Sequence, residues 1–288
     1  MVPAQKRIIL LGNGERPGVL DEVERLKPEI AKYAEIVGED FHGVHDFSDV
    51  DADLAVVFGG DGSVLRSVHQ LGNRQLPVIA VNLGTLAFLA DVQTQELVPL
   101  LSRPDLLDLP VTEHLLLTCR VCRNGETIVP EHVCVNEVCI QAQDFRTLQI
   151  ELYIDAEPVA QYRCDGLILS TPVGSTAHNL SAGGPILRKG LDCIVISPIS
   201  PHTLSNRPVV DSADRTYEVQ MLSDHGALVI DGVLISSVAH GDRIEVRRAD
   251  VTFKTLDIPD HCYYHTLREK LGWSGHFQYI SKGVASGE

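Results

Sequence analysis

The sequence predicts two domains, an α/β domain followed by a β-rich domain, with a helix near the end of the chain. Short β-branched runs alternate with helix-like stretches in the first third. From about Thr112, short alternating runs and hairpin signals replace them, and helical periodicity returns at "YYHTLREKLGW", residues 263–273. The expected division is 1–111, 112–259 and 260–288, with the last segment packing on the first domain.

The first domain is expected to contain a parallel sheet. Three short apolar runs have strand composition: "RIILL" (7–11), "LAVVF" (54–58) and "PVIAVN" (77–82). Between them lie the helix-like stretches "VLDEVERLKPEIAKYAEIV" (19–37) and "SVLRSVHQL" (63–71). Strand–helix–strand alternation favours parallel strands joined by right-handed crossovers.

Each of these three strands is followed by glycine. Gly12 and Gly14 follow the first strand, "GGDG" (59–62) the second, and "NLGT" (82–85) the third. In an open parallel sheet the carboxyl ends of the strands share one edge, and ligands bind there. Three glycine-rich turns on one edge therefore predict a binding site.

The second domain is expected to be built from hairpins. Asn124-Gly125 and Asp231-Gly232 are strong signals for two-residue hairpin turns. "GLILS" (166–170) is a predicted strand, and "STAHNLSAGGP" (175–185) a short helix or loop that ends at glycine and proline. Because no low-complexity linker separates the two halves, we expect the domains to pack closely.

The overall composition narrows the class of protein. Of the 288 residues, 44% are hydrophobic and 22% charged, as in ordinary globular proteins, and the net charge of −15 argues against a nucleic-acid partner. No apolar run reaches the roughly 18 residues of a membrane span, and the N-terminus lacks a signal-peptide pattern, so the expectation is a cytoplasmic protein without a membrane partner. The seven cysteines do not have disulfide-scaffold or zinc spacing, which favours structural thiols over a metal site.

"GGDGS", residues 59–63, combines an anion-binding turn with a carboxylate. Glycines allow phosphate groups to approach the backbone, whose N–H groups and helix start attract anions. Asp61 would repel phosphate unless it binds a metal or accepts a proton from the nucleophile, and both are roles in phosphoryl transfer. The alternative is a tight turn in which Asp61 only caps the helix.

Two further segments are candidate binding surfaces. The run 163–186 is dense in hydroxyl groups and small residues, which suits a polar ligand such as a nucleotide; the alternative is a solvent-exposed loop. Asn136 and Glu137 form a polar pair inside an apolar β run, and the alternative for them is an exposed strand face.

Taken together, these segments resemble the NAD kinase family, whose members phosphorylate NAD to NADP. "GGDGS" resembles the family's Gly-Gly-Asp-Gly-Thr motif, "NLGTLAFL" its Asn-x-Gly-x-x-Gly-Phe-Leu segment, and "NEV" its Asn-Glu pair. "DGLILSTPVGSTAHNLSAGGPI" is similar to the longest and most specific family signature, and "PHTLSNRP" and "LREKLGW" also resemble family segments. His178 stands where the family has Tyr.

The resemblance implies a fold and a set of site residues. The fold is α/β plus β: a Rossmann-like N-terminal domain and a C-terminal β-sandwich with NAD between them. Asp61 is implied to be the general base on the 2′-hydroxyl of the adenosine ribose. The implied substrate-binding residues are Asp61, Gly62, Arg66, Asn136, Glu137, Arg146, Arg163, Asp165, Thr176, Ala177, His178, Asn179, Leu180, Ser181 and Ser200.

The implied partners are NAD and ATP as substrates, a divalent metal such as Mg²⁺, and further copies of the chain in a homodimer or homotetramer. The "GGDG" loop also occurs in lipid and sugar kinases, so such a kinase remains an alternative. A dehydrogenase or an NAD-binding regulator without catalysis are others, although a regulator has no use for Asp61. The choices between ATP and polyphosphate as donor, and between NAD and NADH as acceptor, stay open at this stage.

Overall fold

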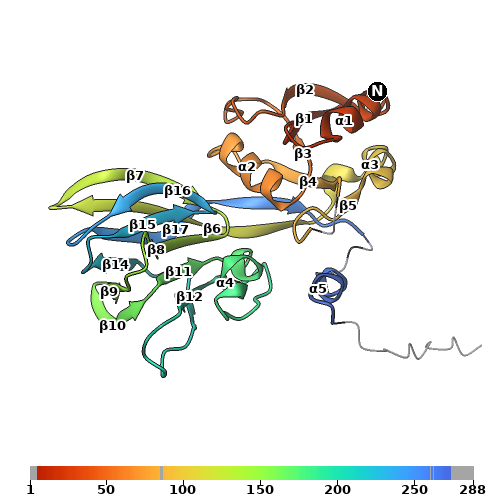
Figure 1. Cartoon of the computed structure of the whole chain (residues 1–288). Coiled ribbons are helices and arrows are strands. Elements are labelled where there is room, and N and C mark those ends of the chain that lie inside the picture. The colour runs from red at the N-terminus through yellow and green to blue at the C-terminus, as the bar shows by residue number, and fades with distance from the viewer. Residues whose placement is uncertain (1–4, 85–86, 260, 262, 274–288) are drawn as a thin grey trace, which may run out of the picture.

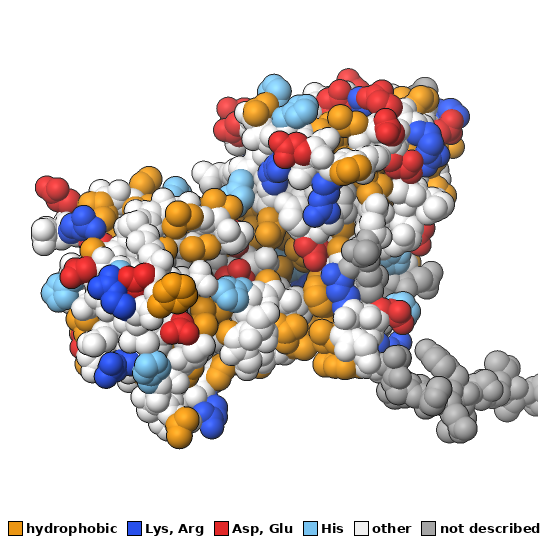
Figure 2. Space-filling model, viewed as in Figure 1, with side chains coloured by type: hydrophobic (Ala, Val, Ile, Leu, Met, Phe, Trp, Pro, Cys, Tyr) orange, Lys and Arg blue, Asp and Glu red, His pale blue; other side chains and the backbone are white. Residues whose placement is uncertain are grey.

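The fold rests on two β-sheets, which the computed structural model describes for residues 5–84, 87–259, 261 and 263–273. Within this part of the chain the larger sheet has eleven strands and the smaller sheet has six. Figure 1 shows an N-terminal lobe in red to yellow, in which helices cover the sheet, and a second lobe made almost entirely of strands. In the space-filling view the surface is hollowed between the two lobes (Figure 2).

The N-terminal lobe is the predicted α/β domain with a parallel sheet. β2, β1, β3 and β4 lie side by side in that order, and each neighbouring pair is parallel. The elements are β1 (Lys6–Gly12), α1 (Val19–Ile30), β2 (Ala34–Asp40), β3 (Leu54–Phe58), α2 (Asp61–Leu71), β4 (Pro77–Asn82), β5 (Val92–Gln93), α3 (Thr94–Leu101) and the 3₁₀ turn η1 (Leu106–Asp108).

The helices cover both faces of this sheet because successive strand residues point to opposite sides. Ile8 and Leu10 of β1 belong to the buried cluster that contains α1 and α3, while Ile9 and Leu11 belong to the cluster that contains α2. Because both faces of these strands are buried, their sequences are continuous apolar runs without alternation of polar and apolar residues.

One predicted helix was too long. The stretch 19–37 was expected to be helical throughout, but α1 ends at Ile30 and residues 34–40 form β2. Pro28 already interrupts the hydrogen bonding of the helix, and β2 pairs in parallel with β1. This pairing is a tertiary contact, which the local pattern of the sequence could not show.

The second lobe is a β-sandwich, which confirms the fold class. Its elements are β6 (Val111–Arg123), β7 (Glu126–Cys134), β8 (Glu137–Ala142), β9 (Leu148–Ile154), β10 (Glu157–Cys164), β11 (Gly166–Ser170), the 3₁₀ turn η2 (Gly174–Thr176), α4 (His178–Ser181), β12 (Cys193–Ile199), β13 (Val209–Ser212), β14 (Tyr217–Met221), β15 (Gly226–Ile230), β16 (Val233–Val238) and β17 (Arg243–Leu256). Both predicted hairpins are present. Positive φ angles at Asn124, Gly125, Asp231 and Gly232 mark their turns.

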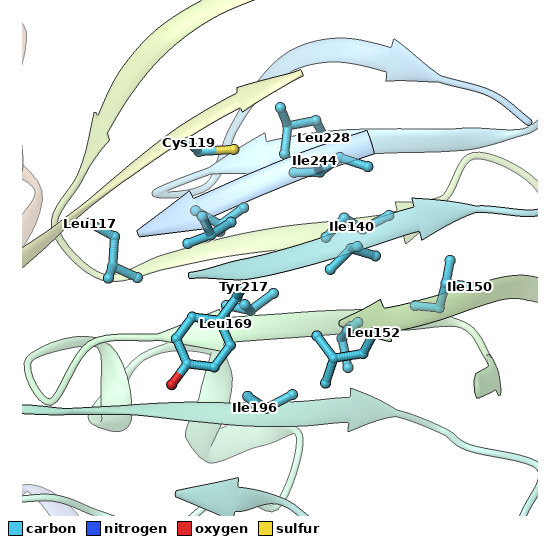
Figure 3. Close-up of a cluster of buried hydrophobic side chains, with 14 of the residues drawn as sticks. Leu117, Cys119, Ile140, Ile150, Leu152, Leu169, Ile196, Tyr217, Leu228 and Ile244 are labelled. Carbon is cyan, nitrogen blue, oxygen red and sulfur yellow. The ribbon is translucent and has the colours of Figure 1, made fainter. Parts of the chain in front are cut away.

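The sandwich core lies between the two sheets. Figure 3 shows Ile140, Leu169 and Ile196 of the smaller sheet pointing toward Leu152 and Tyr217 of the larger sheet, and all five side chains are buried. Cysteines also contribute to this core: Cys119, Cys134 and Cys164 are buried free thiols of the same cluster, as expected for structural residues.

Two long strands connect the lobes. β17 pairs with β14 in the sandwich and, at its far end, with β4 in parallel, while β6 runs beside β17. Phe253 of β17 and Leu116 of β6 lie in the same buried cluster as α2. The domains therefore share a sheet and a core, and the sequence-based division at 111/112 falls at the start of a continuous strand.

The predicted C-terminal helix is also present as α5 (Tyr263–Leu271), drawn in blue in Figure 1. It contacts both lobes: the Tyr263 hydroxyl donates to the Leu187 carbonyl at 2.8 Å, and Lys270 lies 3.9 Å from Asp61. Among the described residues, none of the helices has the length and apolar character needed to cross a membrane.

Candidate active site

A cavity of about 260 Å³ lies at the carboxyl ends of the parallel strands. Its lining includes the "GGDG" loop after β3, Asn82 at the end of β4 and Gly84 just after it, so these two glycine-rich turns do meet at one edge of the sheet. Arg16, from the glycine-rich turn after β1, and Lys270 of α5 complete it. Two basic side chains beside a glycine loop form a site suited to an anion.

The glycine loop has a backbone that other residues could not adopt. Gly59 has φ of 138°, and its N–H donates to the Val81 carbonyl at 2.9 Å. A Cβ atom at Gly59 would lie 2.2 Å from the Ser63 hydroxyl. The chain can therefore turn sharply from β3 into α2, which begins at Asp61.

The Asp61 carboxylate holds the loop that follows β4. Its Oδ1 accepts from the backbone N–H of Leu89 at 2.7 Å, and its Oδ2 accepts from that of Phe88 at 3.0 Å. Lys270 Nζ lies 3.9 Å from Oδ2, and about a third of the Asp61 side chain (32%) is exposed. The helix-cap interpretation is wrong, because Gly60 occupies the N-cap position and no side chain caps α2.

Sequence reasoning missed Arg16 and Lys270. Lys270 lies in "LREKLGW", which carried part of the resemblance but no assigned role. Its ammonium is 4.4 Å from the centre of the Phe88 ring, which holds it beside the cavity. Arg16 follows the first glycine turn, and its guanidinium approaches Gly60. A basic residue in a glycine turn was the available signal for it.

Asn136 and Glu137 lie at the start of β8, within the structure and not on an exposed face. Glu137 is 5% exposed, and its Oε2 has no hydrogen-bond partner among the described residues. Burial, reinforced by the charge of Asp231, raises the pKa of Glu137 to about 7, while the backbone of His178 opposes the rise. A buried oxygen without a partner is costly unless a ligand satisfies it.

Asp231 positions this pair and was missed as a functional residue. Its carboxylate accepts from the backbone N–H groups of Asn136 at 2.7 Å and of Val135 at 2.9 Å. His69 of α2 lies 3.7 Å from the same carboxylate, which links the two lobes. The sequence indicated only a hairpin turn at Asp231-Gly232, so the side chain's second role had no local signal.

The hydroxyl-rich run packs against this pair. The Thr171 N–H donates to the Asn136 carbonyl at 2.9 Å, and a Cβ atom at Gly174 would lie 2.1 Å from the same oxygen. Val173 belongs to the buried cluster that includes Ala87 and Leu89 of the loop held by Asp61. The solvent-loop interpretation is therefore wrong, and the segment lies between the Asp61 loop and Asn136.

The side chains of this run do not all point the same way. Thr176, Ala177, His178 and Leu180 are partly exposed, and Ser181 is exposed. Asn179 is fully buried: its amide donates to two backbone carbonyls, each at 3.1 Å, and its oxygen accepts from the Ser197 hydroxyl at 2.7 Å. The expectation of a substrate contact by the Asn179 side chain is corrected, because internal bonds already use its polar atoms.

The remaining predicted residues lie elsewhere in the chain. Arg146, Asp165 and Ser200 are exposed beyond the far end of the smaller sheet, where the Asp165 N–H donates to the Ile199 carbonyl at 2.9 Å, and Arg163 is exposed nearby on β10 of the larger sheet. β11 separates this end from the end at which Ser170 pairs with Glu137. Gly166 and Ser170, the two ends of β11, are four residues apart, which corresponds to about 13 Å along the strand. Arg66 of α2 packs its side chain against Gly43.

Two packed domains, a glycine loop that holds a carboxylate, basic groups around the loop and a polar cluster on the adjoining sandwich together define a nucleotide-binding kinase. Comparisons with known proteins identify which kind. The family model described as ATP-NAD kinase N-terminal domain matches residues 19–103, and the one described as ATP-NAD kinase C-terminal domain matches residues 135–258. The chain belongs to the NAD kinase family.

Individual relatives agree. The NAD kinase of Rhodopirellula baltica is 46% identical over 272 residues, which cover 93% of this chain and 87% of the relative. The NAD kinase of Geotalea daltonii is 36% identical over 250 residues, which cover 86% of this chain and 87% of the relative. The fold is similar to that of yeast NADH kinase complexed with NADH, with a TM-score of 0.80 and 22% identity. The match covers 96% of this chain and 90% of the yeast chain. Comparison with an Archaeoglobus fulgidus NAD kinase in complex with ATP gives a TM-score of 0.75 and 23% identity. This match covers 93% of this chain and 100% of the Archaeoglobus chain.

Proposed function

We propose that this NAD kinase transfers the γ-phosphate of ATP to the 2′-hydroxyl of the adenosine ribose of NAD, with Asp61 as the general base. The observation that carries this proposal is the Asp61 carboxylate itself. It is partly exposed in a cavity bounded by backbone glycines and two cations, and two backbone N–H groups fix its orientation. A fixed carboxylate beside an anion site suits proton removal from an attacking hydroxyl.

In the proposed reaction, different residues around the cavity have different roles in phosphoryl transfer. The "GGDG" backbone admits the γ-phosphate, and Arg16 and Lys270 offset its charge. Asp61 accepts the proton of the 2′-hydroxyl as the new O–P bond forms and the bond to the β-phosphate oxygen breaks. Held by Phe88 and Leu89, the carboxylate needs little reorganisation during the reaction.

NAD binding is assigned to the sandwich side of the site. The unpartnered Glu137 oxygen supports a hydrogen bond to NAD, and Asn136 adjoins it. Thr176, Ala177, His178, Leu180 and Ser181 are accessible for further contacts, whereas Asn179 supports the segment from within. The yeast relative was crystallised with NADH and the Archaeoglobus relative with ATP, which supports a dinucleotide acceptor and a nucleotide donor.

We also propose that a divalent metal, Mg²⁺, binds to the site together with ATP. Among the described residues there is no group of three or more His, Cys, Asp and Glu side chains that could hold a metal by itself. Mg²⁺ commonly binds through substrate phosphates plus one or two carboxylates, and Asp61 is the carboxylate nearest to the proposed phosphate position. When bound, the metal supplies charge neutralisation on the triphosphate.

A homo-oligomer, either a dimer or a tetramer, is proposed because one chain separates its predicted binding residues. Arg146, Arg163, Asp165 and Ser200 lie at the opposite end of β11 from Glu137. A neighbouring subunit can bring its own copies of these residues to the site. A cytoplasmic location is proposed from the free thiols of the described cysteines, which are typical of a reducing compartment.

The direct test is to incubate the purified protein with NAD, ATP and MgCl₂ and to measure NADP by mass spectrometry. We expect NADP and ADP in equal amounts. Parallel reactions replace ATP with polyphosphate, NAD with NADH, and NAD with diacylglycerol or a hexose. Phosphorylation of the lipid or sugar without NADP formation would establish the alternative kinase, and NAD binding without product would establish a regulator.

A further inference from the structure

Lys189 connects the two lobes next to Asp61. It lies just after the segment that contains α4, and its ammonium group donates a hydrogen bond to the backbone carbonyl of Phe88. The Lys189 side chain is partly buried and lies 5.6 Å from the centre of the Tyr263 ring of α5. Neither the sequence motifs nor the proposed reaction assigns a role to this lysine.

The carbonyl that Lys189 contacts belongs to the same peptide group that holds Asp61. The peptide between Phe88 and Leu89 presents its C=O to Lys189 and its N–H to Asp61 Oδ1, at 2.7 Å. Because a peptide is planar, an ammonium on the oxygen fixes the direction of the N–H. Hydrogen bonds in such a chain polarise one another, so the N–H becomes a stronger donor to the carboxylate.

The other end of the connection is anchored in the proposed NAD-binding segment. The Leu187 N–H donates to the Ser175 hydroxyl at 3.0 Å, and the Leu187 carbonyl accepts from Tyr263 at 2.8 Å. Residues 187–189 are thus tied to η2, to α5 and, through Lys189, to the loop that holds Asp61.

Several charged and titratable groups surround Lys189. Burial lowers its pKa, and the carboxylates of Asp91 and Asp61 oppose that change, while Lys270 adds to it. His114 also lies close enough to be affected by the Lys189 charge: burial, and then this charge, lowers the pKa of His114 to about 4. The carboxylates favour the protonated lysine, which is the form that donates to Phe88.

We propose that Lys189 is a positioning residue for Asp61: through the peptide between Phe88 and Leu89, it orients the carboxylate. The proposal rests on the proposed role of Asp61 as general base. Without Lys189 the Phe88 carbonyl loses its partner, the peptide can rotate, and Asp61 Oδ1 loses a well-aligned donor. The carboxylate should then be less well aimed at the ribose hydroxyl.

The test compares wild type with Lys189→Met, which keeps the aliphatic length but not the donor, and Lys189→Arg, which keeps a cationic donor. We expect Lys189→Met to lower kcat on the order of 10- to 100-fold with KM for NAD and ATP nearly unchanged. Lys189→Arg should recover most of kcat.

Lys6→Met is the matched control, because Lys6 also donates to a backbone carbonyl, that of Leu101 at 3.1 Å, away from the site. It should keep wild-type kcat and KM values. Wild-type kcat in Lys189→Met would overturn the proposal, and so would an equal loss in Lys6→Met. If Lys189→Met does not fold, Lys189→Leu, which also lacks a donor, is judged by the same two measurements.

Failure of the proposed function has a different signature. If wild type makes no NADP, or if Asp61→Asn keeps full turnover, then the role of Asp61 is wrong. If wild type is active and Asp61→Asn is not, while Lys189→Met has normal kcat, only the role of Lys189 is wrong.

Discussion

At the scale of single residues, Asp61 combines two roles that the sequence could not separate. Its carboxylate organises the loop after β4 through Phe88 and Leu89, and it faces a cavity lined by basic side chains. Each oxygen already accepts one hydrogen bond, yet a carboxylate has about four acceptor positions in total. Capacity therefore remains for a ribose hydroxyl or a metal ion.

Asp61→Asn should lower turnover by about 10²- to 10⁴-fold, because the amide cannot accept the proton. It should also lower the free energy of unfolding by roughly 1–3 kcal/mol, since one of the two backbone N–H groups then faces an NH₂ group. Turnover, NAD affinity and the thermal midpoint are measured on the same preparation across a magnesium series.

Asp46→Asn is the control for this substitution, because Asp46 is an exposed carboxylate that accepts from the Ser48 N–H at 2.8 Å. It should leave turnover unchanged. Partial recovery of Asp61→Asn at high magnesium would assign metal binding to Asp61 in place of proton transfer. Near-wild-type turnover at all magnesium concentrations would contradict both roles.

Glu137 makes stability depend on pH in a defined direction. Its pKa is raised from 4.5 to about 7, so the folded protein holds this proton more tightly than the unfolded chain does. The stabilisation is complete below about pH 4.5 and is lost as the pH rises through about 7. Relative to Glu137→Gln, wild type should lose on the order of 2–3 kcal/mol of stability between pH 5 and pH 8.

Urea unfolding of wild type and Glu137→Gln at pH 5 and pH 8 measures this difference. Glu126→Gln, at an exposed hairpin position, is the matched control and should follow wild type at both pH values. Equal pH dependence in wild type and Glu137→Gln would show that Glu137 ionises normally in the folded protein. Saturating NAD should reduce the effect if NAD supplies the missing hydrogen bond.

At the scale of elements, the approach of η2 to the start of β8 decides the shape of the proposed NAD site. A Cβ atom at Gly174 would lie 2.1 Å from the backbone oxygen of Asn136, which cannot move aside as a flexible side chain can. Gly174→Ala should therefore separate the two segments and destabilise the fold by about 1–3 kcal/mol. KM for NAD should rise more than KM for ATP.

Gly190→Ala is the comparison for Gly174→Ala, because nothing lies within 4 Å of a Cβ atom at Gly190. This substitution should be neutral or slightly stabilising, by up to about 1 kcal/mol. Thermal midpoints and the two KM values of both variants are compared with wild type. Similar behaviour of the two alanine variants would mean that the close approach of η2 to Asn136 has no functional importance.

At the scale of the whole molecule, two groups of predicted binding residues lie near opposite ends of β11. Arg146 pairs with Asp144 in its own chain, and the Phe145 ring between them is fully exposed. An arginine and an exposed aromatic side chain are common at protein interfaces. This surface is thus suited to contact a neighbouring subunit near its NAD site.

Arg146→Ala should raise KM for NAD roughly 10-fold or more, with a smaller change in kcat, if the guanidinium reaches a neighbour's nucleotide. Arg103→Ala is the matched control, since Arg103 also pairs with an aspartate two residues away, Asp105. It should leave both constants unchanged. Light scattering of wild type should show a dimer or tetramer, and a monodisperse, fully active monomer would contradict this assignment.

The sequence by itself determined the fold class, the glycine-rich edge of the parallel sheet, both hairpins and the terminal helix. These features depend on local patterns: apolar runs of strand length, turn residues with positive φ at Asn124-Gly125, and helical spacing after residue 263. The family signature likewise consists of contiguous segments, so a single chain was enough to predict "GGDGS" and Glu137 as site residues.

Only the tertiary structure decided what depends on contacts between distant residues. The first part of β2, residues 34–37, was predicted to be helical because its strand character comes from pairing with β1. Asp231 and Lys189 contact the site from turns distant in sequence, and Asn179 turned inward because the carbonyls and hydroxyl around it satisfy its amide. Burial and hydrogen-bond partners are properties of the packed chain, which no local pattern encodes.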